Sequence, residues 1–130
     1  MNYIQNWCDR LHSSPGSSMK GSIRIEGISD KHLGPRIEYA RIVFECMPAD
    51  DFEVDFGEYR NRASVTEQLF LEAAIFGFLD IALLHEPRPL RSICLRVVQV
   101  DFDDTNSSQM AFRHAGQDAA RKVLTAGCIQ

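Results

Sequence analysis

The sequence predicts an α+β fold: a four-stranded, mostly antiparallel sheet with two helices packed on one face. Three observations predict it. Residues 22–27 alternate polar and apolar side chains, as a half-buried strand does. A capping serine, Ser64, precedes a long apolar stretch typical of a buried helix. Near the end of the chain, a strand leads through an acidic turn into a helix with a face of small residues.

The composition indicates one compact domain. The chain has 130 residues, of which 45% are hydrophobic, and this is enough for a core of its own. We expect residues 21–130 to form the domain and residues 1–20, with a Ser/Pro/Gly-rich run, to form a partly ordered N-terminal extension. Basic residues leading into an apolar run are absent at the N-terminus, and acidic residues interrupt the most apolar stretch, 69–84. We therefore expect a cytoplasmic protein without membrane contact.

Charge and cysteine usage narrow the function classes. The formal net charge is −4, and the absence of a basic tail or lobe argues against general affinity for nucleic acids. The cysteines are widely spaced without a C-x-x-C pair, which indicates free thiols in a reducing compartment, not a zinc site or a disulfide framework. They are Cys8, Cys46, Cys94 and Cys128.

The first half of the chain predicts three strands. After the strand at 22–27 comes a polar turn at 29–36 and then a second strand at 39–47, which Pro48 ends. Residues 52–56 are predicted to be the hairpin partner of the second strand. Three consecutive strands favour an antiparallel meander.

The second half predicts a helix, a strand and a helix. Ser64 and Glu67 form a capping box at the start of a helix over 65–84, which Pro87 and Pro89 end. A fourth strand follows at 93–102. The final helix, from residue 107 to about 124, is capped by Asn106, Ser107 and Ser108, with Asp103 and Asp104 near its positive end.

The final helix carries small residues at four-residue spacing, which predicts close packing on a neighbour. Its small face consists of Ala111, Ala115, Gly116, Ala119, Ala120 and Val123. We expect the other directions of this helix to face solvent, at Arg113, Gln117, Arg121 and Lys122.

The order of these elements, and the motif Ser107-Ser108-Gln109-Met110-Ala111-Phe112, resembles domain IV of translation elongation factor G over roughly residues 20–126. The resemblance implies a left-handed β-α-β crossover, as in a small-subunit ribosomal protein and the GHMP kinases, where the general rule predicts a right-handed one. It also implies a role in translation, in which two loops at the domain tip enter the decoding region and contact ribosomal RNA.

The tip loops depart from the family pattern. The first has lost most of the family's glycines and keeps Lys31, His32, Gly34 and Arg36. The second, 103–106, is shorter, acidic and without the family's histidine, and Gln109 replaces the family's glutamate. An acidic turn repels RNA phosphate. A second hypothesis is therefore a protein-interaction or self-assembly domain that has lost ribosome binding and pairs through an edge strand.

Signals for enzyme chemistry are weak in this sequence. It contains no G-x-x-x-x-G-K-[ST] phosphate loop and no GHMP-type glycine loop, and the aspartates at 101–104 lack the glycine and distal glutamate of a calcium loop. Two cysteines lie within predicted strands, where burial suppresses thiol reactivity. The histidines, His12, His32, His85 and His114, lack metal-ligand spacing. We expect no catalytic, metal or cofactor residue and no small-molecule ligand.

Two basic clusters are the candidate contacts for RNA or the ribosome. One lies around the first loop and the other around the connection from the long helix to the last strand, where His85 and Arg96 also lie. The candidates are Lys31, His32, Arg36, Arg41, Arg88 and Arg91. The alternative is a solvated rim, because Glu38 and Glu86 lie among these charges and no aromatic side chain is interleaved to stack on bases.

Overall fold

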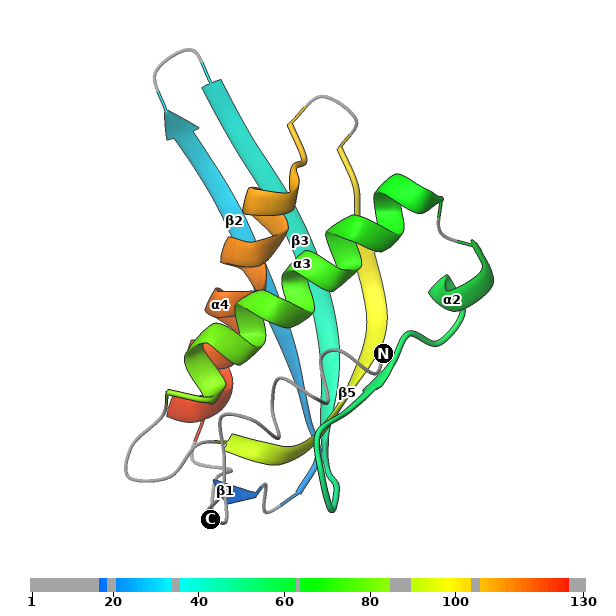
Figure 1. The fold of residues 1–130 in the computed structure, drawn as a ribbon. Helices are drawn as coiled ribbons and strands as arrows, with labels where there is room; N and C mark the ends of the chain where they lie inside the picture. The colour runs from blue at the N-terminus through cyan, green and yellow to red at the C-terminus, as the bar shows by residue number, and fades with distance from the viewer. Residues whose placement is uncertain are drawn as a thin grey trace.

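A computed structural model describes residues 17–18, 21–33, 36–62, 64–84, 90–103 and 106–126. Its strands are β1 (Ser17–Ser18), β2 (Ile23–Leu33), β3 (Arg36–Pro48), β4 (Glu53–Asp55) and β5 (Leu90–Asp101). Its helices are α2 (Tyr59–Arg62), α3 (Val65–Ala82) and α4 (Gln109–Thr125). Figure 1 shows α3 and α4 on the same face of the sheet, so the predicted fold class is confirmed.

The main sheet has the order β4-β5-β3-β2. β3 is antiparallel to both of its neighbours, β2 and β5, while β4 runs parallel to β5. β1 adds a short parallel pairing at the start of β5. The prediction of a hairpin between residues 39–47 and 52–56 is wrong, since Glu53–Asp55 pairs with β5. Both edges of β3 are already occupied, so the following strand cannot pair with β3 and pairs with the far edge of β5 instead.

The connection from β4 to β5 is a left-handed crossover. In Figure 1, viewed from the helix side, the chain rises along β4, returns through α3 in front of the sheet and rises again along β5 to the left of β4. Such connections are right-handed in nearly all proteins. The handedness expected from the resemblance is therefore present.

The β2–β3 hairpin is longer than predicted. Most of the expected polar turn at 29–36 is strand, with Lys31 opposite Glu38 and Leu33 opposite Arg36. Ser29 is buried and Asp30 is exposed, as in the alternation of the preceding residues, whereas Lys31 and His32 are both exposed. Polar residues can extend the strand here because their side chains have polar partners on the side that faces α4. Ser29 hydrogen-bonds to Glu38, and Lys31 lies near His114.

Both predicted helices are present, with shifted bounds. Ser64 accepts a hydrogen bond from the backbone of Glu67, whose carboxylate in turn accepts from the backbone of Ser64, which confirms the capping box. α3 ends at Ala82, before the two prolines, which lie outside the described residues. α4 begins two residues later than predicted, capped by Ser108. None of the helices in the described part of the chain is long and apolar enough to cross a membrane.

Close backbone packing joins α4 to its neighbours. A Cβ added to Gly116 would collide with the carbonyl oxygen of Ala74 in α3, and one added to Gly27 would collide with that of Ala115. Neither position has space for a side chain. The predicted small face of α4 is confirmed by its buried residues Ala111, Phe112, Ala115, Gly116, Ala119, Ala120 and Val123.

On the other side of the final helix, Arg113 is exposed, as predicted, and its guanidinium also forms two hydrogen bonds with Asp80 of α3, at 2.7 and 2.8 Å. Gln117 donates to the same carboxylate at 3.2 Å. Asp80 also raises the pKa of Arg113 through these hydrogen bonds. Polar side chains at the rim therefore fix α4 against α3.

Candidate nucleic-acid interface

Two chain connections meet at one end of the molecule. Figure 1 shows the end of the β2–β3 hairpin and the turn from β5 into α4 at the same end. We call this region the tip; its described part comprises residues 29–33, 36–39, 103 and 106–114. The backbone N–H of Tyr39 donates to Asn106 O at 3.1 Å, and Ser107 Oγ donates to Tyr39 O at 2.9 Å. The two connections are thus tied together by direct hydrogen bonds.

Asp103 holds the turn from β5 into α4 in place through several hydrogen bonds. Its carboxylate accepts hydrogen bonds from the backbone N–H of Asn106 at 3.1 Å and from the Asn106 side-chain amide at 3.0 Å. Its own N–H donates to Ser107 Oγ at 2.9 Å. These bonds support the sequence-based interpretation of a helix-capping turn. Among the residues that the structure describes, no three potential ligands gather to hold a metal ion.

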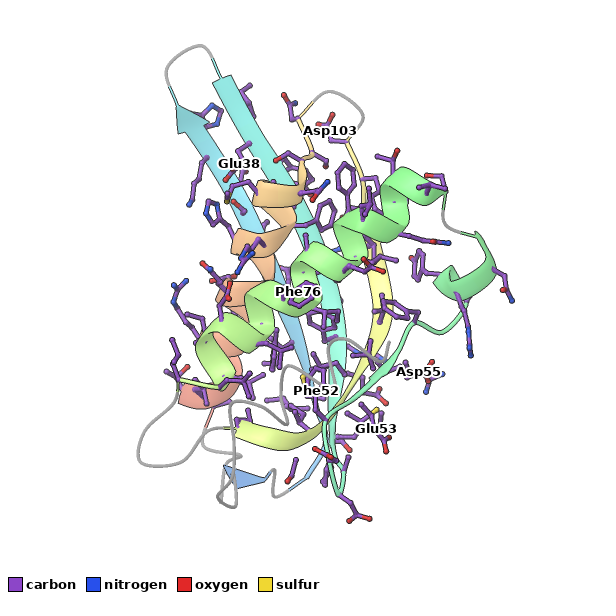
Figure 2. All side chains as sticks on the ribbon, viewed as in Figure 1. Glu38, Phe52, Glu53, Asp55, Phe76 and Asp103 are labelled. Carbon is purple, nitrogen blue, oxygen red and sulfur yellow. The ribbon has the colours of Figure 1, made fainter. Side chains whose placement is uncertain are left out.

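A polar cluster lies where the hairpin meets α4, and Figure 2 shows Glu38 beside the start of that helix. We call it the Glu38 cluster: Ser29, Lys31, Glu38 and His114. His114 Nδ1 lies 3.0 Å from Glu38 Oε2, which also accepts from Ser29 Oγ at 2.9 Å. Lys31 Nζ lies 3.4 Å from the same His114 nitrogen. Sequence patterns did not indicate this cluster, because its strand and helix residues are far apart in the chain.

The carboxyl group of Glu38 is held in its charged form. Burial raises its pKa, but the hydrogen bonds from His114 and Ser29, together with the charges of His114 and Lys31, outweigh burial and lower the pKa overall. The Glu38 side chain is only 13% exposed, whereas that of His114 is 31% exposed. A fixed, buried carboxylate thus lies behind an accessible imidazole.

Three of the predicted contact residues have described side chains, Lys31, His32 and Arg41, and these do not all lie on one face of the sheet. Lys31 faces α4, whereas His32 is exposed on the opposite face of the hairpin, as the alternation of a strand requires. Arg36 and Arg91 are described by their backbone alone, and Arg88 lies outside the described residues.

Arg41 is committed to structure on the sheet face away from the helices. It contacts Glu26 at 2.7 Å and Asp101 at 3.1 Å, and its side chain is 25% exposed. Hydrogen bonds to Glu26 and Asp101 raise its pKa. Two carboxylates therefore balance its charge, which makes it a poorer phosphate contact than Lys31.

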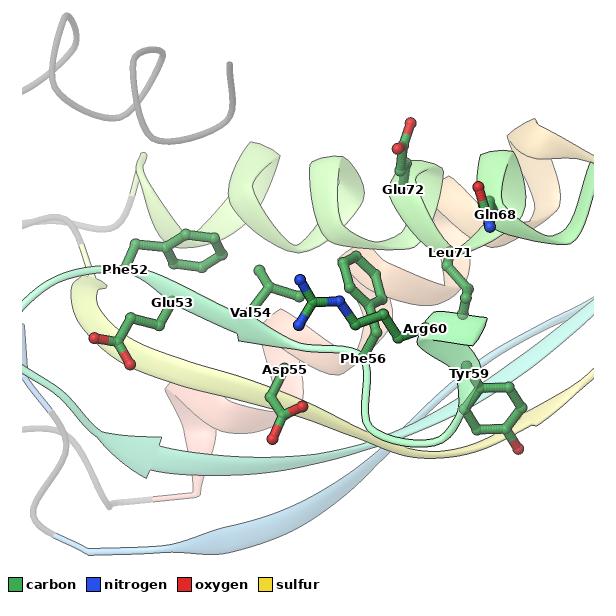
Figure 3. A pocket seen from close by; sticks show the side chains of 10 residues that line it. All are labelled: Phe52, Glu53, Val54, Asp55, Phe56, Tyr59, Arg60, Gln68, Leu71 and Glu72. Atoms are coloured by element: carbon green, nitrogen blue, oxygen red, sulfur yellow. The ribbon is translucent and has the colours of Figure 1, made fainter. Parts of the chain in front are cut away.

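A hollow of about 640 Å³ lies between β4, α2 and the first turns of α3. In Figure 3, Val54 and Phe56 point toward α3, Arg60 extends across Val54, and the carboxylates of Glu53 and Asp55 point away. The sequence did not predict α2 and so did not predict this hollow. A small-ligand site requires polar groups that converge on one point, and the charged groups of this hollow do not.

The fold and the tip define a class of domain: a mixed sheet with a left-handed β-α-β crossover, two helices on one face and two connections at one end. No protein-family model matches the chain, and none of the curated proteins is significantly similar to it. Among solved structures, 57 chains match. One is a protein from Thermus thermophilus, with a TM-score of 0.68 and 21% sequence identity. The match covers 82% of this chain but only 16% of the Thermus chain. In the Thermus protein, the matching region is therefore a small part of a much longer chain.

Proposed function

We propose that this chain is a non-catalytic domain similar to domain IV of translation elongation factor G, which binds the ribosome or structured RNA through its tip. The observation that carries the proposal is the meeting of the hairpin end and the β5–α4 turn at one end of the molecule. The resemblance implies RNA contact by these two connections. The left-handed crossover and the fold shared with one region of a larger Thermus protein support the same assignment.

The charges at the tip support a phosphate contact centred on the hairpin. Lys31 and His32 are exposed there, and Arg36 begins β3 at the hairpin end. Asp103 works against phosphate binding, but its carboxylate already accepts two hydrogen bonds from Asn106, which reduces its effect on a ligand. Arg41 contributes little to phosphate binding, because two carboxylates already pair with it. RNA contact by Arg88 and Arg91 remains a prediction.

The alternative function, self-assembly through an edge strand, is disfavoured along the middle of β2. The outward-facing N–H of Ile28 and C=O of Glu26 are bound by Asp118 and Lys122 of α4. Another chain would have to displace both side chains before it could pair there.

Co-sedimentation with ribosomes and separated subunits at low and moderate salt tests the proposal. We expect the protein to pellet with one subunit in a salt-sensitive manner, because phosphate contacts release counterions. The double variant Lys31→Glu/Arg36→Glu should bind more weakly and reduce the slope of log K against log salt by about 2.

The matched control is Arg24→Glu/Arg121→Glu, which makes the same change of charge at the opposite end of β2 and near the end of α4. Both side chains are exposed. Circular dichroism should confirm that both double variants fold. Equal loss of binding in the two variants would show a nonspecific effect of net charge, and absence of pelleting by the unmodified protein would overturn the proposed function.

A further inference from the structure

We propose that His114 contacts an RNA phosphate through Nε2, with Glu38 as its positioning residue and Lys31 as its cationic neighbour. This inference rests on the function proposed above and extends the contact surface from the tip loops onto α4. It adds a residue that the sequence analysis treated as isolated.

The hydrogen bonds assign the role of each ring nitrogen. His114 Nδ1 lies 3.0 Å from Glu38 Oε2 and 3.4 Å from Lys31 Nζ. An ionised carboxylate can only accept, and an ammonium can only donate, so one nitrogen cannot hydrogen-bond to both at once. The shorter contact with the carboxylate assigns the proton to Nδ1, where it is donated to Glu38. The Lys31 ammonium is then a neighbouring charge without a hydrogen bond to the ring.

The other ring nitrogen is available for a ligand. Within the described residues, no hydrogen bond is made by Nε2. The group behind it is rigidly held, because Ser29 is 3% exposed and donates to the same oxygen of Glu38. A histidine that a buried carboxylate holds in one orientation loses less conformational freedom when it binds.

The surrounding charges specify an anion. With Nε2 protonated, the Glu38 cluster carries two positive groups and one negative group. Asp118, one turn further along α4, is bound to Lys122 and the Ile28 N–H. Asp80, facing from α3, is bound to Arg113. A cation would lie next to the Lys31 ammonium without a second ligand, whereas a phosphate oxygen would accept from both Nε2–H and Lys31.

Fluorescence anisotropy with a fluorescein-labelled RNA stem-loop tests the inference. We expect the unmodified protein to bind the RNA in a salt-sensitive manner, as phosphate contacts require. His114→Gln should bind about tenfold more weakly, the loss expected for one charged hydrogen bond. The matched control is Arg121→Gln, an exposed residue near the end of the same helix, which should bind the RNA as tightly as the unmodified protein.

Histidine ¹⁵N NMR separates this role from a merely structural one. Glu38→Gln should change the tautomer of the His114 ring and weaken RNA binding while the protein stays folded. Inorganic pyrophosphate distinguishes the source of the phosphate: shifts of His114 Nε2 with the stem-loop at concentrations where pyrophosphate has no effect support an RNA contact, and equal responses to both overturn it in favour of a general anion site.

Two further outcomes separate this inference from the proposed function. If the unmodified protein pellets with ribosomes and His114→Gln binds the RNA as tightly as the unmodified protein, the inference is wrong and the proposed function stands. If the unmodified protein binds neither ribosomes nor the stem-loop, the proposed function is wrong and the inference fails with it.

Discussion

Asp118 of α4 accepts a hydrogen bond from the backbone N–H of Ile28 in the edge strand β2, with 3.0 Å between the two atoms. Four residues further along the helix, Lys122 donates to the backbone oxygen of Glu26 at 2.8 Å and pairs with Asp118 at 3.0 Å. Edge strands normally present such groups to other chains. The helix therefore covers the middle of the edge with two side chains that also neutralise each other.

We predict that Asp118→Ala/Lys122→Ala lowers the free energy of unfolding by about 1 kcal/mol, since it leaves a partly buried N–H without its acceptor. The exposed edge should also promote self-association. Urea unfolding measures the first effect, and light scattering across a range of concentrations measures the second. Arg121→Ala, which removes an exposed charge from the same helix, is the control. A monomeric double variant with unchanged stability would mean that these side chains do not protect the edge.

A second prediction concerns the contact between the two helices. Gly77→Ala would drive a Cβ into the carbonyl oxygen of Arg113, and Gly116→Ala would drive one into that of Ala74. Alanine is intrinsically the better helix former by about 1 kcal/mol, so packing and propensity predict opposite signs. We expect packing to dominate, with a loss of about 3 kcal/mol for either variant, measured by chemical denaturation.

Gly21→Ala is the control for these two variants, because a Cβ there meets nothing within 4 Å. Its free energy of unfolding should change by no more than about 0.5 kcal/mol. Unchanged or increased stability of the Gly77 and Gly116 variants would show that α3 and α4 are further apart than described.

The third prediction is a pH dependence of stability from Glu38. The folded state lowers the pKa of this carboxyl below its ordinary value of 4.5, so the contribution to stability is complete above 4.5 and is lost as pH falls through the lower folded value. We expect Glu38→Gln to cost about 1–2 kcal/mol at neutral pH. The difference from the unmodified protein should shrink at acid pH, as the carboxyl of Glu38 takes up its proton. Urea unfolding at both pH values measures it.

An exposed carboxylate on β4 provides the comparison for Glu38. Glu53→Gln removes the same charge outside the cluster, at a side chain that is exposed, and should have little effect at either pH. If Glu38→Gln is as stable as the unmodified protein at neutral pH, the hydrogen bonds from Ser29 and His114 do not stabilise the fold.

The parts of the fold that the sequence predicted are those that depend on near neighbours. The capping box of Ser64 and Glu67 spans three residues, and the small face of α4 repeats every four. Each pattern can be recognised without knowledge of the partner element, because helix geometry alone places those side chains together. The strand at residues 22–27 was recognised for the same reason, since its alternation is local.

Long-range pairing accounts for what the sequence did not predict. Which strand lies beside Glu53–Asp55 depends on the edges that β2 and β5 have already taken on β3. The contact between Glu38 and His114 joins residues 76 positions apart, and each alone looked like an ordinary surface charge. Only the resemblance supplied the crossover handedness, because local patterns carry no information about it.

The fourth prediction is that Cys46 reacts with iodoacetamide far more slowly than Cys94 in the native protein. Cys46 is fully buried on the helix side of β3, and burial, together with the nearby Cys94 and Glu45, raises the pKa of its thiol to about 12. Cys94 is only partly buried, although burial raises the pKa of its thiol as well. The thiolate is the reactive form of cysteine. Cys46 is therefore protected in two ways, because reagent cannot reach it and because its thiol stays protonated.

Peptide mass spectrometry after a labelling time course separates the four cysteines. Urea should abolish the difference between Cys46 and Cys94, since both thiols then have ordinary pKa values and full access. Cys94→Ser should leave the slow native labelling of Cys46 unchanged, because burial is the main cause of its protection. Native labelling of Cys46 at the rate of Cys94 would require that the helices separate readily from the sheet, in conflict with the close packing of α4 on β2 at Gly27.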